Sequence, residues 1–88
     1  PVETFNNLRE QLTLLEWPDV YFFKFIVPND QLKIAQITAF FDENATIGFH
    51  PSGKGNYISI SVKAVMLNVD EIITIYEQAS AINGVISL

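Results

Sequence analysis

Hydrophobic residues recur with two different periods along the 88-residue chain, and these periods predict the order of its helices and strands. Near the start, a stripe of apolar residues at helical spacing predicts a helix with Thr4 as its N-cap. The stripe consists of Phe5, Leu8, Leu12 and Leu15. Trp17-Pro18 ends this helix, because the residue before a proline disfavours the helical conformation. We therefore divide the chain into an N-terminal helix with its connector (1–18) and a main domain (19–88).

Residues 20–27 are rich in β-branched and aromatic side chains and predict a strand. Both faces of this strand are largely apolar, which is typical of a central strand. Lys24 is its one charged residue, and we expect it on the less buried face with Val20, Phe22 and Ile26. Some aromatic rings must then face away from the core helices. Either the N-terminal helix or another subunit covers them, and the sequence leaves both alternatives open.

Pro28-Asn29-Asp30 ends the strand and offers a cap for a helix that we expect to reach about Glu43. Its apolar positions at helical spacing are Leu32, Ala35 or Gln36, Ile37, and Phe40 or Phe41. A shorter strand over 45–50 follows, and the turn residues of 51–56 predict a hairpin connection.

Residues 57–66 carry the clearest two-residue period in the chain. One set, expected to face the core, is Ile58, Ile60, Val62, Ala64 and Met66. The alternate set, expected to face water or a partner, is Tyr57, Ser59, Ser61, Lys63 and Val65.

Asn68 and Glu71 resemble a capping box at the start of the next helix, which carries Ile72, Ile75, Tyr76 and Ala79. Asn83-Gly84 closes this helix, and residues 85–88 form a last strand. After the first helix the order is βαββαβ. This order predicts an α+β, ferredoxin-like two-layer sandwich with an antiparallel sheet and two helices on one face.

Several motifs of the chain resemble the YbeD-like family of small bacterial proteins of unknown function. Leu15-Glu16-Trp17-Pro18 with Phe23-Lys24 is similar to the opening of that family, and Ile75-Tyr76-Glu77 fits the corresponding helix. Its central signature is similar to the run Pro51-Ser52-Gly53-Lys54-Gly55-Asn56-Tyr57, followed by Ser59 and Ser61. The resemblance spans 12–88 and implies a ferredoxin-like sandwich similar to ACT regulatory domains, which often pair through their sheets and sense small molecules.

The composition of the chain disfavours several classes of protein. Ten Asp and Glu against five Lys and Arg give a net charge of −5, which disfavours nucleic-acid binding because that rests on Lys and Arg. An RNA-recognition domain shares the βαββαβ order, but Ser59 and Ser61 stand where its stacking rings would lie. No apolar run approaches the length of a membrane helix, and no signal peptide is visible. With no cysteine, the chain reads as a cytoplasmic protein without disulfides or thiolate sites.

Catalytic motifs are incomplete. Residues 48–55 approach the phosphate-binding P-loop, but Gly55 replaces the hydroxyl residue and the segment joins two strands rather than opening a helix. His50 is the single histidine, so it cannot form a multi-histidine metal site. We therefore predict no enzymatic activity, catalytic residue, metal or cofactor.

Two candidate contact sites remain. The first is a ligand or partner contact at the hairpin, formed by Ser52, Lys54, Gly55, Asn56 and Tyr57. The second is a sheet-face interface at Ser59, Ser61 and Lys63. We interpret the chain as a non-enzymatic regulatory or protein-interaction module that pairs with itself or another protein through the sheet, with small-molecule sensing as one version. A nucleic-acid-binding domain of the same topology and a small enzyme without a recognised motif are the alternatives.

Overall fold

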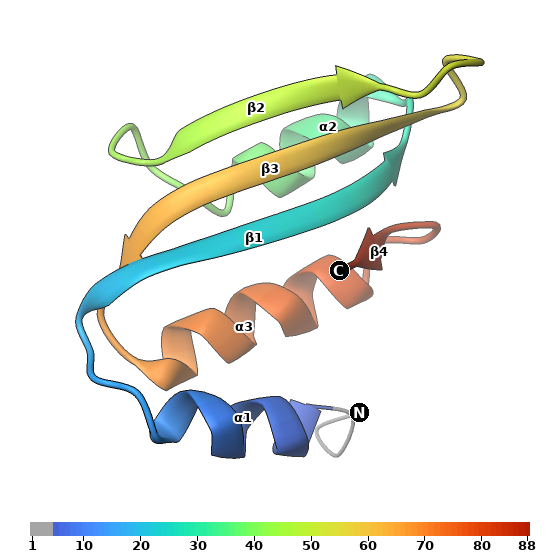
Figure 1. The fold of residues 1–88 in the computed structure, drawn as a ribbon. Coiled ribbons are helices and arrows are strands. Elements are labelled where there is room, and N and C mark those ends of the chain that lie inside the picture. Colours follow the sequence, from blue (N-terminus) through green and yellow to red (C-terminus); the bar gives the residue numbers. More distant parts are fainter. Residues whose placement is uncertain (1–4) are drawn as a thin grey trace.

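Four strands form one antiparallel sheet in the computed structural model, which describes residues 5–88. Helices α2 and α3 cover one face of the sheet, and α1 lies beside α3 in the same helical layer (Figure 1). The elements are α1 (Asn6–Thr13), β1 (Asp19–Pro28), α2 (Gln31–Thr38), β2 (Thr46–Pro51), β3 (Tyr57–Met66), α3 (Val69–Ser80) and β4 (Ile86–Ser87). The strand order is β2-β3-β1-β4. The α+β class and the antiparallel sheet expected from the sequence are confirmed.

Strands β1 and β3 form the centre of the sheet and pair over ten residues, from Asp19 with Met66 to Pro28 with Tyr57. This register places Phe23 beside Val62 and Phe25 beside Ile60, and all four side chains are buried under the helices. The alternation expected in β3 is confirmed, because its even-numbered residues face the helices while Lys63 and Val65 are exposed. A full-length central pair of this kind fixes which face of each strand enters the core.

Helix α2 begins as expected, since the Asp30 carboxylate accepts hydrogen bonds from the backbone N–H groups of Leu32 and Lys33. The expectation that the helix reaches Glu43 is wrong, because it ends at Thr38. The backbone N–H groups of Phe40 and Phe41 bond to carbonyls three residues back, which tightens the chain into a turn. This turn brings the Phe41 ring to 5.2 Å from that of Phe23. Of the apolar positions expected at helical spacing, Ile37 is buried, whereas the Leu32 side chain is largely exposed.

Helix α3 begins at the expected cap, where the Asn68 side-chain oxygen accepts from the backbone N–H of Glu71. The Glu71 carboxylate in turn accepts from the backbone N–H of Leu67, one residue earlier than an ideal capping box. The helix ends at Ser80, so Gly84 does not close it directly. Instead Gly84, with φ of +85°, turns the chain back toward β1.

Strand β4 is shorter than the predicted 85–88. It pairs only Ser87 with Phe25 and Ile86 with Ile26. The backbone N–H of Leu88 adds one hydrogen bond to the carbonyl of Lys24. The C-terminal end of the chain therefore runs beside the middle of β1.

Helix α1 packs against α3 and not on the sheet. Its Leu12 is buried, the Phe5 ring stacks on that of Tyr76 at 6.1 Å, and Arg9 forms an ion pair with Asp70. The predicted apolar stripe is wrong at its end, because the helix stops at Thr13 and the Leu15 side chain is 58% exposed. The expected cap residue, Thr4, lies outside the described residues. None of the helices within 5–88 is long and apolar enough to cross a membrane.

The Tyr76 hydroxyl is the polar group of the core. It lies 2.9 Å from the hydroxyl of Tyr21 and joins α3 to β1. Burial, together with this hydrogen bond, raises the pKa of Tyr76 well above the usual tyrosine value. The neutral phenol is therefore the form that the fold stabilises.

We predict that Tyr76→Phe lowers the free energy of unfolding by about 1 kcal/mol at pH 8, because the hydrogen bond to Tyr21 is lost. Above the usual tyrosine pKa of about 10, an unfolded Tyr76 ionises while the folded one keeps its proton. This difference lowers the stability of the wild type as pH rises, and the variant does not share this loss. The gap between the two proteins should shrink from pH 9 to pH 11 in urea unfolding curves.

Tyr57→Phe is the control for this experiment at pH 8. The Tyr57 side chain is exposed, so its hydroxyl can be removed with little change in stability. A stability gap between wild type and Tyr76→Phe that stays constant up to pH 11 would contradict the assignment.

Candidate functional site

Alternate residues of the strands point away from the helices and form a surface that we call the open face. Figure 1 looks onto this surface, and no described helix covers it. Its cross-strand rows are Val20 with Val65; Phe22 with Lys63 and Thr46; Leu88 with Lys24, Ser61 and Gly48; and Ile86 with Ile26, Ser59 and His50. The predicted placement of Lys24 beside Val20, Phe22 and Ile26 is confirmed.

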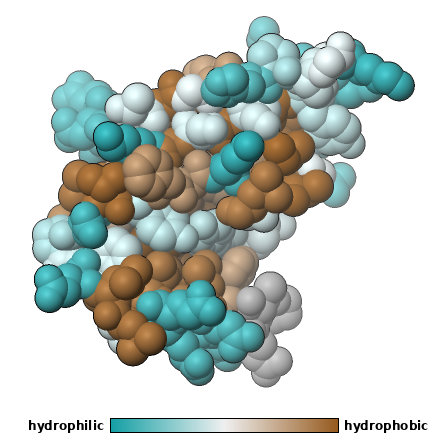
Figure 2. Space-filling view, in the orientation of Figure 1, coloured by the Kyte–Doolittle hydropathy of each residue, from teal (hydrophilic) through white to brown (hydrophobic). Residues whose placement is uncertain are grey.

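The open face combines apolar and basic side chains. Figure 2 shows apolar patches over it, separated by hydrophilic groups. Among the basic residues, Arg9 and Lys33 form side-chain hydrogen bonds within 5–88, and Arg9 also forms an ion pair. Lys24 and Lys63 form neither kind of contact there. The two lysines are diagonal neighbours on β1 and β3, with Cβ atoms on the order of 7 Å apart. Both are therefore available to a group that approaches the sheet.

A shallow hollow of about 600 Å³ lies on the open face between these lysines. Gly48 and Ser61 line it where the strands offer little side-chain bulk, and Phe22 and Leu88 contribute apolar surface. The hollow is open to solvent, and Thr46 adds a hydroxyl to its lining. Two ammonium groups, two hydroxyls and apolar surface can together receive a carboxylate carried on an apolar stem.

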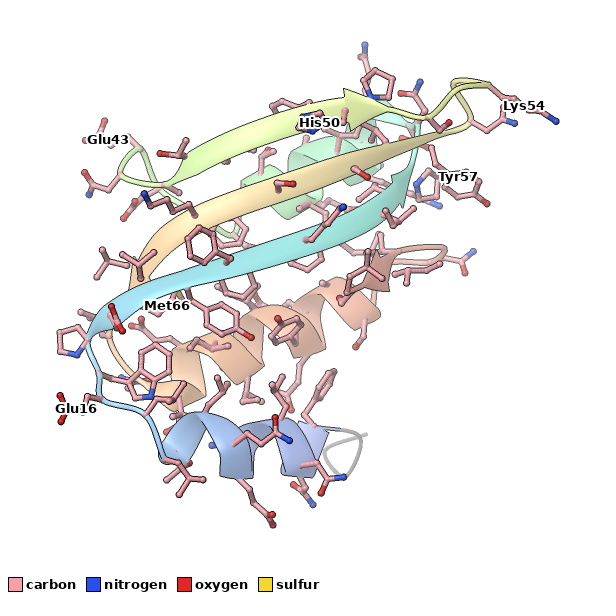
Figure 3. All side chains as sticks on the ribbon, in the orientation of Figure 1. Glu16, Glu43, His50, Lys54, Tyr57 and Met66 are labelled. Atoms are coloured by element: carbon pink, nitrogen blue, oxygen red, sulfur yellow. The ribbon has the colours of Figure 1, made fainter. Side chains whose placement is uncertain are left out.

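The hairpin residues form the second candidate site. The Ser52 hydroxyl accepts a hydrogen bond from the backbone N–H of Tyr57, and the backbone N–H of Gly55 bonds to the Ser52 carbonyl. The Asn56 carbonyl accepts from the backbone N–H of Asn29, and the Gly55 carbonyl accepts from the Asn29 side chain. These bonds shape the loop and tie it to the start of α2. Lys54 extends from the tip of the hairpin, away from the sheet (Figure 3). The ligand-contact role of this loop stays a prediction.

The hairpin and the face residues lie on one connected strand. Tyr57 begins β3, and Ser59, Ser61 and Lys63 follow along its open side. Lys54 lies beyond the strand end, so the structure does not bring it to the hollow.

Hydrogen-bonded side-chain pairs and clusters of metal-ligating residues are the two features of known catalytic sites that can be sought among residues 5–88. The two side chain to side chain hydrogen bonds found there join Arg9 to Asp70 and Tyr21 to Tyr76. Neither pairs a serine with a base. Within the same range, no three His, Asp or Glu residues come together as metal ligands.

Comparison with known proteins identifies the family. A family model described as a protein of unknown function, DUF493, matches residues 12–88. The chain belongs to the DUF493 family. This is the YbeD family expected from the sequence, over the expected range. No curated protein and no solved structure was found to match the chain.

In this DUF493 protein, the sheet-face set predicted from the sequence contains only the β3 residues at the centre of the open face. Ser59, Ser61 and Lys63 came from the alternation of β3, but Phe22, Lys24 and Gly48 were not assigned to a site. The alternation of β1 placed Lys24 on the correct side of the strand. Together with the alternation of β3, this alternation predicts that Lys24 and Lys63 lie on the same side of the sheet. Gly48 carried no comparable signal, because its contribution to the hollow depends on its pairing with Ser61.

We predict that Gly55→Ala destabilises the DUF493 hairpin by about 1 kcal/mol, because Gly55 adopts a φ of +75° that a residue with Cβ disfavours. Gly53→Ala is the matched control in the same loop, since its φ lies outside the positive region and no atom lies within 4 Å of an added Cβ. Urea unfolding measures both variants. Equal stability of the two would contradict this account of the turn.

Proposed function

We propose that this DUF493 protein is a non-enzymatic interaction module that binds a protein partner through its open face. One observation carries the proposal: α1 packs on α3, and the open face keeps its large apolar side chains in water. These side chains are Val20, Phe22, Val65, Ile86 and Leu88. An exposed apolar surface with polar groups among it is typical of a protein-binding site.

The exposed apolar residues outside the open face are scattered, and this contrast supports the open face as the binding surface. Leu14 and Leu15 follow α1, Leu32 lies on α2, Leu67 lies between β3 and α3, and Phe49 lies on the helical side of β2. They come from separate elements, whereas the open-face residues occupy neighbouring rows of one sheet. Scattered single exposures are normal in a globular protein and need no partner.

The arrangement of residues 19–88 supports a finer assignment to the ferredoxin-like sandwiches. The strand order β2-β3-β1-β4, with α2 and α3 on one face, fits that architecture. By analogy with ACT domains, a regulatory role and homodimerisation through the sheet are versions of the proposal. Fold analogy is a weaker argument than the chemistry of the face itself.

Affinity capture with matched variants tests the proposal. Phe22 is 69% exposed on the open face, and Leu14 is 85% exposed after α1. We expect a protein that binds the wild type and Leu14→Ser to be lost with Phe22→Ser, because a buried aromatic ring contributes more than about 1 kcal/mol at a binding hot spot. The affinity of the purified partner for the three proteins is then compared by calorimetry.

Sedimentation at several protein concentrations tests whether the protein forms a homodimer through the open face. A dimer of the wild type that dissociates in Phe22→Ser supports pairing through the open face. A strict monomer removes the homodimer version. Identical captured proteins and affinities for Phe22→Ser and Leu14→Ser would overturn the proposed function.

A further inference from the structure

The acidic residues within 5–88 lie outside the open face. The chain has twice as many acidic as basic residues, yet the rows of the open face contain two lysines and no acidic residue. Among residues 5–88, the acidic side chains lie on the helices, their caps and the connecting segments, with Asp19 as the one acid in a strand. Asp19 is paired with the buried Met66 and so lies on the helical side of the sheet.

The two lysines lie near each other on the open face. Lys24 and Lys63 are diagonal neighbours across the β1–β3 pair. No carboxylate within 5–88 bonds to either of them. A carboxylate placed over the hollow that both lysines line can bond to both ammonium groups.

The apolar residues extend well beyond the hollow. Val20 and Val65 lie toward one end of the rows, and Ile86 and Ile26 lie toward the other. From Val20 to Ile26, β1 spans roughly 20 Å. A small anion would contact the two lysines but leave these flanking residues in water. The spacing favours a longer occupant, with an acidic centre and apolar residues on both sides.

The charges of the open face and of the whole protein also favour one class of macromolecule over others as the occupant. A second copy docked face to face would bring a second pair of lysines onto the same apolar surface, with no acid on either face to compensate them. A nucleic acid would need more cations than two, and it would meet a protein of net charge −5. Among residues 5–88, the row of Lys24, Ser61 and Gly48 separates Phe22 from His50 and Tyr57, the other aromatic side chains on this side, so these rings form no continuous stacking surface.

We propose that the open face binds an acidic amphipathic segment of another protein, with a carboxylate of that segment held between Lys24 and Lys63 over the hollow at Gly48. Apolar side chains of the segment contact Phe22 and Val65 on one side and Leu88 and Ile86 on the other. This inference rests on the proposed function and adds the chemistry of the partner to it.

Selection from a random peptide library displayed on phage tests the inference with the full chain as bait. We expect selected peptides to be enriched in Asp and Glu beside apolar residues. Their affinity should fall at least about tenfold for the double variant Lys24→Glu/Lys63→Glu, because two charge pairs become repulsive. The same affinity should weaken as salt is raised.

The matched control replaces four exposed glutamines of the helices by glutamate, which makes the same change in net charge outside the open face: Gln11→Glu/Gln31→Glu/Gln36→Glu/Gln78→Glu. Circular dichroism verifies that the face variant and the control are folded. If the face variant does not fold, Lys24→Gln/Lys63→Gln replaces it. Retained binding by the control together with loss in the face variant supports the inference.

Other outcomes overturn the inference and separate it from the proposed function. Peptides without acidic enrichment that still lose binding to Phe22→Ser overturn the acidic partner and leave an interaction face. A wild-type dimer that Phe22→Ser dissociates does the same, since a second copy then occupies the face. Peptides that bind Phe22→Ser and the lysine variant as tightly as wild type overturn both. A single-stranded uridine oligonucleotide that binds more tightly than any peptide assigns the face to nucleic acid and overturns both.

Discussion

The pairing of β1 with β3 is the interaction on which the rest of the structure depends. Over ten residues, their register places apolar positions of the two strands side by side on the helical side, except at Met66, which lies beside Asp19. A slip of one residue would turn the buried Phe23 and Phe25 toward water. Strands β2 and β4 attach to the outer sides of this pair, and α2 and α3 cover its apolar face. The same register aligns Lys24 with Ser61 and Lys63 with Phe22. The β1–β3 pairing therefore determines both the core and the open face.

The docking of α1 explains why the sheet keeps an uncovered side. Leu12 and Phe5 find apolar contacts on α3, where the Tyr76 ring and its bond to Tyr21 lie close to the sheet edge. A helix that satisfies its apolar residues on α3 has none left for the other side of the sheet. Apolar residues on that side therefore remain in contact with water, and Lys24 and Lys63, which form no ion pair within 5–88, lie among them. The interaction surface that we propose follows from this division of apolar residues between the two layers.

Much of the fold followed from local pattern. The two-residue alternation in β3 and the caps at Asp30 and Asn68 depend on residues close in sequence, and all three were predicted correctly. Element ends were less predictable. Helix α2 stops early because Phe41 packs on Phe23, a contact with a distant strand that no local pattern contains. The length of strand β4 depends on its pairing with β1, which is distant in sequence, and only Ile86 and Ser87 pair with that strand.

The sequence by itself determined the alternation of the strands, the positions of the caps, the excess of acidic charge and the resemblance to the DUF493 family. These properties depend on neighbouring side chains or on composition, so they can be read along the chain. The tertiary structure alone decided that α1 docks on α3, and that Gly48, Ser61, Lys24 and Leu88 meet in one row. These residues are far apart in sequence, and only the strand register and the packing of the helices bring them together. For the same reason, the residues of the hairpin were visible as a motif, while the open face became visible as one surface only in the folded chain.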